Sequence, residues 1–163
     1  MTTIAFGQNQ NISSGVVFDG EPYLAIDPNN SQHIVVAWMS WINISNQFKI
    51  KTKTSFDGGQ NWSSAVEHPH VVSSYKSADP CIDFDNVGNV FVCYIDFDGI
   101  DPPVNGGVYI RKSIDGGLTW NTPVEVINAN YDGTKWPIDR PWLVIDKSNG
   151  VYGGTIYVTT MNG

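Results

Sequence analysis

The chain has 163 residues and a formal net charge of −7, and 15% of its residues are charged while 12% are aromatic. This balance excludes intrinsic disorder, which needs few aromatic residues and much charge. It also excludes a nucleic-acid partner, because clustered basic residues are required and the sequence has only two arginines, Arg111 and Arg140. The abundance of aromatic, β-branched and turn-forming residues predicts an all-β fold.

Hydropathy and cysteine content set two further limits. No apolar run approaches the roughly 18 residues of a membrane-spanning helix, so no membrane span is predicted. Residues 1–7 lack the basic start and long apolar stretch of a signal peptide. Two cysteines, Cys81 and Cys93, are too few for a disulfide scaffold.

The predicted elements follow one another as short strands. In chain order, the first unit has strands near residues 23–27, 33–38, 47–55 and 65–66. The third of these alternates apolar and polar residues, which is typical of a half-exposed strand. The same order returns near residues 79–85, 89–94, 108–113 and 124–126, and its first two strands return near 140–146 and 155–160. Four antiparallel strands in a unit of about 58 residues indicate a propeller blade.

An internal repeat supports this interpretation. Residues 55–62 match residues 113–120 at an offset of 113 − 55 = 58, and residues 21–27 match 79–85 at 79 − 21 = 58. A third copy ends at Asp146, which lies 146 − 85 = 61 residues after its counterpart Asp85. Since two separate segments share one period, chance is a poor explanation.

The blade assignment follows from this period. We expect one partial propeller over residues 1–163, with about two and a half to three blades of four antiparallel strands. Its expected parts are the tail of a preceding blade (1–20), two blades (21–78 and 79–139) and the first half of a further blade (140–163). The chain is then either a fragment of a larger propeller or a short chain that closes a ring by self-association, because open strand edges need a partner.

A turn of the same composition follows the third strand of both complete units. The two sets are Ser55, Asp57, Gly59 and Trp62, and Ser113, Asp115, Gly117, Thr119 and Trp120. Glycines permit a positive φ, the Ser and Asp side chains hydrogen-bond within the turn, and the tryptophan packs back on the blade. These turns resemble the Asp-box, or BNR repeat, with pattern Ser-x-Asp-x-Gly-x-Thr-Trp, from which the first departs only at Asn61.

From about residue 21 to 160 the chain therefore resembles the bacterial sialidase-like Asp-box propellers. The resemblance implies a glycan or glycoprotein ligand, a glycoside hydrolase of the exo-sialidase type, and an extracellular, cell-surface or periplasmic location. It also implies that Asp-boxes lie on the rim, away from the active site. Because noncatalytic receptors and assembly factors share the repeat, a carbohydrate- or protein-binding scaffold is the alternative.

The start of each inner strand is the candidate site. The repeat places Glu21, Asp79 and Arg140 at equivalent positions, with Asp139 beside Arg140, and these residues are expected to converge near the propeller axis. We predict Asp139 and Arg140 as catalytic residues and Glu21, Asp79 and Trp136 as substrate-binding residues, in a pocket of acid, base and apolar walls. The alternative is that polar residues before proline merely mark strand entries.

Sialidase chemistry, as the resemblance implies it, needs three arginines to hold the sialate carboxylate. Only Arg140 and Arg111 are present, and Arg111 is expected on a solvated strand face. The arginine triad is therefore incomplete in this chain. A glycosidase that uses two carboxyl groups stays open, because it needs only their correct separation.

Other candidates have simpler expected roles. Asp96, Asp98 and Asp101 offer oxygen ligands suited to Ca²⁺, but they lack the EF-hand spacing, so a solvated loop is expected and no metal or cofactor is predicted. Residues 68–70, His-Pro-His, are expected in an exposed connection, and Trp142 is expected in the core. A turn at residues 86–88 places Cys81 opposite Cys93, either as a cross-strand disulfide or, as we expect, as two buried thiols.

Overall fold

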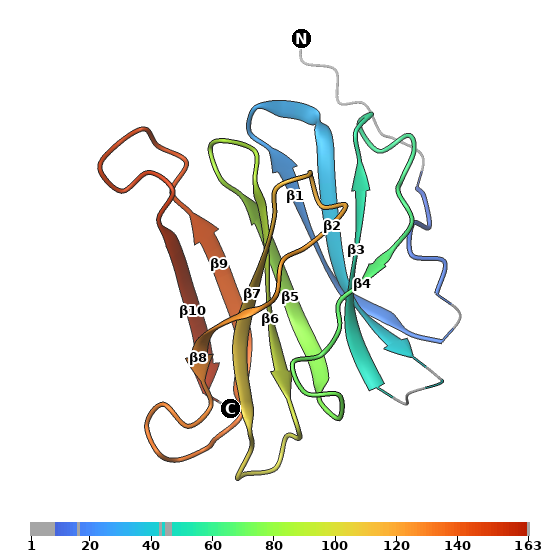
Figure 1. Ribbon diagram of the computed structural model, residues 1–163. Coiled ribbons are helices and arrows are strands. Elements are labelled where there is room, and N and C mark those ends of the chain that lie inside the picture. The colour runs from blue at the N-terminus through green and yellow to red at the C-terminus, as the bar shows by residue number, and fades with distance from the viewer. Residues whose placement is uncertain (1–8, 16, 43, 45–46, 163) are drawn as a thin grey trace.

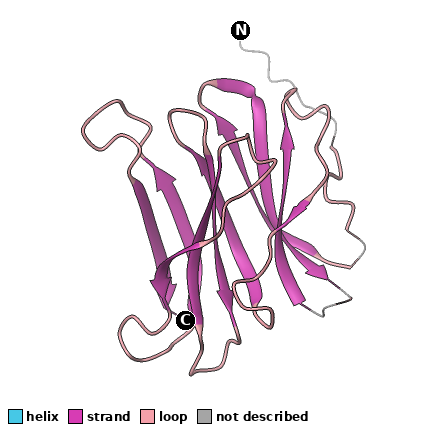
Figure 2. Cartoon of the chain, in the orientation of Figure 1, coloured by secondary structure: helices cyan, strands magenta, loops and turns pink. Residues whose placement is uncertain are grey.

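The computed structural model describes residues 9–15, 17–42, 44 and 47–162, and all regular structure in these ranges is β-strand. The part of the predicted N-terminal tail at residues 1–8 lies outside them. The described residues form two four-stranded antiparallel sheets and a two-stranded sheet, which fan out side by side (Figure 1, Figure 2). The predicted all-β propeller-blade architecture is confirmed.

Strand order within each sheet follows the chain. The first sheet contains β1 (Asp19–Asp27), β2 (Asn30–Ile42), β3 (Gln47–Ser55) and β4 (Val66–Glu67). The second contains β5 (Lys76–Phe84), β6 (Val90–Phe97), β7 (Gly106–Ser113) and β8 (Val124–Asn128). The third contains β9 (Ile138–Ile145) and β10 (Ile156–Asn162). The structure contains no helix, among these residues, with the length and apolarity that a membrane crossing requires.

Two hydrophobic cores join the sheets. One lies between the first and second sheets, where Val35 and Ile50 pack with Phe84 and Tyr94. The other lies between the second and third sheets, where Cys93 and Leu143 are both buried. Side chains on a strand alternate between the two faces of a sheet, so the second sheet has both faces covered. This is why the apolar residues of β6 run nearly without interruption instead of alternating with polar ones.

The two Asp-box turns are locked by their own side chains. In the second turn, the Ser113 hydroxyl donates to Asp115 Oδ1 at 2.7 Å and accepts from the Gly117 amide at 2.8 Å. The Thr119 amide donates to the same aspartate at 2.9 Å. Equivalent bonds link Ser55, Asp57, Gly59 and Asn61 in the first turn. Gly59 and Gly117 have φ values of 89° and 91°, so the predicted need for positive φ is confirmed.

The second turn also fastens the first sheet to the second. The Gly116 carbonyl accepts a hydrogen bond from the Thr54 hydroxyl at 2.9 Å, and His33 Nε2 lies 3.0 Å from the same oxygen. These contacts cross 62 and 83 positions of sequence. The second Asp-box therefore holds two neighbouring blades together at the end where β3 and β7 finish.

Two basic side chains are buried, contrary to the expectation that they lie in solvent. The Arg111 guanidinium donates to Tyr94 Oη at 2.9 Å and to the carbonyls of Asn121 and Pro69 at 2.9 and 2.8 Å. His68 is buried against the Trp120 ring, with a centroid distance of 5.2 Å. Both expectations are wrong because the connection between β4 and β5 packs into the interface between two sheets.

Cys81 and Cys93 lie directly opposite each other on β5 and β6, as predicted. Both are free and buried. The Cys81 sulfur accepts a hydrogen bond from the Leu143 amide at 3.2 Å, which links β5 to β9. Burial raises the pKa of both thiols, so they stay protonated at neutral pH.

Candidate functional site

Three of the five predicted site residues stand at equivalent β-bulges. Strand pairing is interrupted between Gly20 and Tyr23, between Ala78 and Cys81, and on the β9–β10 pair between Thr159 and Met161. The residues at these interruptions are Glu21, Asp79 and Arg140, each followed by a proline. Proline cannot donate to the strand ladder, so the bulge turns the preceding side chain out of the sheet.

All three residues have a left-handed backbone. The φ values are 52° for Glu21, 53° for Asp79 and 48° for Arg140. This conformation costs a non-glycine residue about 1 kcal/mol or more, and strain of this kind gathers at functional sites. The same backbone conformation recurs in three blades, each time at a charged residue that precedes a proline.

Carboxylates connect the bulges from blade to blade. The Asp79 amide donates to Glu21 Oε2 at 3.3 Å, and the Arg140 amide donates to Asp79 Oδ2 at 3.1 Å. Each acid thus accepts a hydrogen bond from the backbone N–H that has no partner in the strand ladder at the bulge of the next blade. These contacts bring the three strand starts together.

Asp79 and Asp139 form a coupled carboxyl pair. Burial, together with the hydrogen bond to Glu21, raises the pKa of Asp79. The hydrogen bond with Asp79, followed by burial, raises the pKa of Asp139. The contact between the two carboxyl groups raises the pKa of Asp139 and lowers that of Asp79, whose pKa is raised on balance by burial, so both groups hold a proton to higher pH than an isolated aspartate does. The pair can therefore donate a proton under conditions where an isolated aspartate is already ionised.

The Arg140 guanidinium is free to meet a ligand. Its side chain is 77% exposed, and its Nε lies 3.9 Å from Asp139 Oδ2, which is a loose contact. Arg111, by contrast, is fully engaged in the protein interior. Arg140 is thus the one arginine of the two in the sequence whose donors face solvent.

The bulges surround an open hollow of about 600 Å³, a typical size for a small-molecule site. Its lining includes Glu21, Tyr23, Asp79, Arg140 and Trp142, with Thr159 and Met161 from β10. Burial raises the pKa of Tyr23 to about 12, so this side chain stays a neutral phenol. We call this space the central hollow.

Trp142 lies outside the core, so the prediction of a core position is wrong. It is 54% exposed, and its ring meets the Tyr23 ring edge-on at a centroid distance of 5.4 Å. The reason is strand alternation, since Leu143 and Ile145 take the buried positions of β9 and leave Trp142 on the other face. An aromatic surface is therefore added to the central hollow.

Trp136 and Asp139 line a second hollow, of about 430 Å³, beside the first. Asp79 lines both hollows. The walls of the second are mainly apolar and include Phe97, Ile100 and Pro137, and Trp136 is 50% exposed. We call this space the Trp136 hollow.

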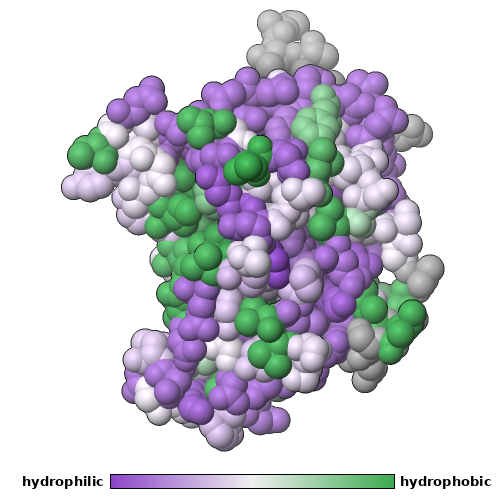
Figure 3. All heavy atoms as spheres, in the orientation of Figure 1, coloured by the Kyte–Doolittle hydropathy of each residue, from purple (hydrophilic) through white to green (hydrophobic). Residues whose placement is uncertain are grey.

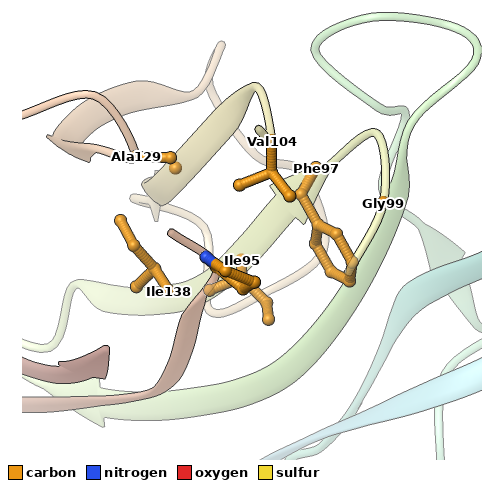
Figure 4. A pocket seen from close by; sticks show the side chains of 8 residues that line it. Ile95, Phe97, Gly99, Val104, Ala129 and Ile138 are labelled. Atoms are coloured by element: carbon orange, nitrogen blue, oxygen red, sulfur yellow. The ribbon is translucent and has the colours of Figure 1, made fainter. Parts of the chain in front are cut away.

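A small, partly enclosed cavity adjoins the Trp136 hollow. It measures about 10 Å³ and shares Ile95, Phe97, Pro137 and Ile138 with that hollow. Figure 4 shows the side chains of Ile95, Val104, Ala129 and Ile138 turned toward one another around it. Its lining is apolar, so it is not suited to hold a water molecule. The Trp136 hollow thus has a dry, well-packed base.

Two of the three aspartates considered for Ca²⁺, Asp96 and Asp98, are engaged in hydrogen bonds within the protein. Asp96 is fully buried, accepts from the Val71 amide at 2.6 Å and from Ser77 Oγ at 2.9 Å, and lies 2.8 Å from His70 Nδ1. Asp98 accepts from the Asn105 amide at 2.8 Å. Across the described ranges, no group of three or more His, Cys, Asp or Glu side chains is placed to hold a metal ion.

The expectation of an exposed connection is wrong for His70 too, because its side chain is buried against Asp96. The bonds from Ser77 and Val71 to Asp96 tie the β4–β5 connection to the start of β5, two residues before Asp79. No local sequence pattern points to this network, because Asp96 lies 19 to 26 positions after its partners.

Solved structures share this fold. The chain superposes on an alpha-L-arabinanase from Penicillium chrysogenum complexed with arabinobiose, with a TM-score of 0.58, 18% identity, and coverage of 86% of this chain and 39% of the other. A GH93 alpha-L-arabinofuranosidase of Fusarium graminearum with arabinobiose matches with a TM-score of 0.59 and 20% identity, over 86% of this chain and 39% of the other. A Hadza microbial sialidase matches with a TM-score of 0.51 and 16% identity, over 88% of this chain and 31% of the other.

These similarities establish the fold as part of a β-propeller like those of glycoside hydrolases. The chain spans 39% of the length of the arabinanase that it matches. No protein-family model and no curated protein matches the sequence.

Proposed function

We propose that this chain forms part of a glycoside-hydrolase-type propeller and that its central hollow binds a neutral sugar. The observation that carries the proposal is the convergence of three strained bulges on one hollow, which Glu21, Asp79 and Arg140 line and which Asp139 adjoins. Strained backbone, coupled acids and exposed aromatic rings in one concave space are typical of a ligand site.

The charge of the hollow favours a neutral sugar over sialate. Glu21 and Asp79 line the hollow and Asp139 lies beside it, whereas Arg140 is the only arginine there. An anionic sugar acid would meet these carboxylates with a single guanidinium to balance them. Two of the structural neighbours are complexes with arabinobiose, a neutral disaccharide, which agrees with this preference.

Each residue has a role in this proposal. Arg140 donates hydrogen bonds to sugar hydroxyls, while Tyr23 and Trp142 offer ring faces and edges. In hydrolysis, the bond between the anomeric carbon and the bridging oxygen breaks, and the proton held by the Asp79–Asp139 pair passes to that oxygen. Water supplies the hydroxyl group to the anomeric carbon, and its other proton returns to the pair.

A noncatalytic sugar-binding scaffold is the second candidate. It is favoured by the amide hydrogen bonds that Glu21 and Asp79 already accept, because a carboxylate engaged in this way is less free to attack or to activate water. Release of arabinose from arabinobiose supports the enzyme, whereas binding without turnover supports the scaffold. The location outside the cytoplasm that the sequence resemblance implies stays a prediction.

Calorimetric titration with arabinobiose and with 3′-sialyllactose tests the proposal. We expect arabinobiose to bind more tightly than sialyllactose, and Arg140→Ala to weaken arabinobiose binding at least about tenfold. Lys112→Ala is the matched control, because Lys112 lies near the Asp-box end of β7, away from the hollow. Preference for sialyllactose, or no binding of either sugar, would overturn the proposal.

A further inference from the structure

The Trp136 hollow meets the central hollow at a single shared residue, Asp79. Its other polar wall is Asp139, the partner of Asp79, and the remaining lining residues are apolar or aromatic. A ligand that crosses from one space to the other must therefore pass over the two carboxyl groups. Neither space is formed by Asp-box residues, so both belong to the end of the blades where β5 and β9 begin.

We propose that the Trp136 hollow is a second sugar subsite, which binds the ring on the far side of the linkage from the ring in the central hollow. This inference rests on the proposed function, since it names where the leaving part of the same neutral glycan lies. The ring would lie against the exposed indole of Trp136, with the linkage above Asp79 and Asp139.

The composition of the hollow fits a sugar ring. Trp136 offers a broad apolar face with half of its surface in solvent, and Phe97, Ile100 and Pro137 line the same space. Indole faces stack well on the C–H face of a ring, and a polar rim is left for the hydroxyls. The volume of about 430 Å³ accommodates one ring but not a long chain.

The walls are held before any ligand arrives. Ile138 is buried, and the small apolar cavity beside the hollow is lined by side chains that pack around it (Figure 4). Near the hollow, the Lys135 carbonyl accepts a hydrogen bond from the Val104 amide at 3.0 Å, which ties the segment before Trp136 to the β6–β7 connection. A preformed wall loses little freedom on binding, so it contributes more to affinity than a loose loop does.

The test compares the affinities of the full 163-residue chain for L-arabinose and arabinobiose by calorimetry. The subsite predicts that arabinobiose binds at least about tenfold more tightly than arabinose. Trp136→Ala should reduce that ratio to near one, whereas Trp136→Phe, which keeps an aromatic face, should preserve most of it. Val87→Ala, at an exposed turn between β5 and β6, is the matched control and should leave the ratio unchanged.

Two negative results can be told apart. If both sugars bind equally well, or if Trp136→Ala keeps the ratio, the second subsite is wrong while the central site stands. If neither sugar binds to the chain, the proposed function and the subsite fall together.

Discussion

The backbone amide of Arg140 donates a hydrogen bond of 3.1 Å to the carboxylate of Asp79, a residue 61 positions earlier in the chain. In the same way, the backbone amide of Asp79 donates a hydrogen bond to the carboxylate of Glu21, 58 positions before it. Each bulge is thus held by the acid of the preceding blade. The third bulge carries a basic residue, Arg140, instead of an acid. Its guanidinium makes a loose contact of 3.9 Å with Asp139, and its other N–H donors face the central hollow.

Replacing Asp79 with asparagine should lower the pKa of Asp139. The hydrogen bond with Asp79 is the main reason that the pKa of Asp139 is raised. An amide cannot share a proton with Asp139, and its N–H can instead stabilise the ionised form. Carbon-detected NMR titration of the Asp139 carboxyl group measures the change, and Asp115, at the other end of the sheet, should titrate as before. An unaltered Asp139 titration in Asp79→Asn would refute the coupled pair.

Arg140→Gly should stabilise the fold relative to Arg140→Ala. Alanine keeps a side chain in the left-handed conformation, with φ near 48°, whereas glycine adopts it without strain. We expect the free energy of unfolding of the glycine variant to exceed that of the alanine variant by about 1 kcal/mol. Both variants should lose sugar binding. Urea denaturation measures the difference, and a more stable alanine variant would show that the backbone is not strained there.

The strands and Asp-boxes are predictable from sequence because their determinants are local. The Ser113 and Asp115 bonds lie within one turn, and a period of two residues is visible along β3. Arg111 is different, since one of its acceptors, the Pro69 carbonyl, is 42 positions away and no local pattern points to it. The environment of Arg111 therefore depends on how two blades pack.

The same distinction holds at the site. Alignment of the repeats is enough to group Glu21, Asp79 and Arg140, because equivalent positions in a propeller share one end of the blades. The repeat does not reveal which face of β9 is buried, so it fails to predict the exposure of Trp142. The raised pKa of Asp139 is equally hidden, since it depends on a side-chain contact with Asp79 across two blades.

Acid should destabilise the fold through His68. Burial is the main cause that lowers the pKa of His68 to about 3, and the nearby Arg111 charge adds to it. The unfolded chain binds the proton near pH 6.5, so this histidine stabilises the fold above that pH. The contribution is lost as the pH falls from about 6.5 toward 3, with a slope of up to about 1.4 kcal/mol per pH unit.

His68→Gln supplies the control, because glutamine can still bond to the Thr52 hydroxyl, which lies 3.2 Å from His68 Nε2. Urea denaturation between about pH 7 and pH 4.5 should give a flatter stability profile for the variant than for the parent protein. Parallel profiles would mean that His68 is protonated in the folded state.

The outer face of the third sheet should promote association. Val144 and Tyr157 are exposed there, beside Trp142 and Met161 of the central hollow, and Figure 3 shows apolar residues gathered along the side of the molecule where β9 and β10 lie. Apolar surface left in water costs about 25 cal/mol per Å². Light scattering at micromolar concentration should therefore detect species larger than a monomer, and Tyr157→Lys should reduce them. A monodisperse monomer that the substitution leaves unaltered would contradict the prediction.

The central claim is that the end of the blades where Glu21, Asp79 and Arg140 meet binds a sugar. Backbone amide NMR of the 163-residue chain during addition of arabinobiose tests this most directly. We predict that the amide signals of Asp79 and Arg140 shift with saturation, while those of Gly59 and Gly117 in the Asp-boxes stay in place. Shifts confined to the Asp-box amides, or no shift at Asp79 and Arg140 at millimolar sugar, would contradict the claim.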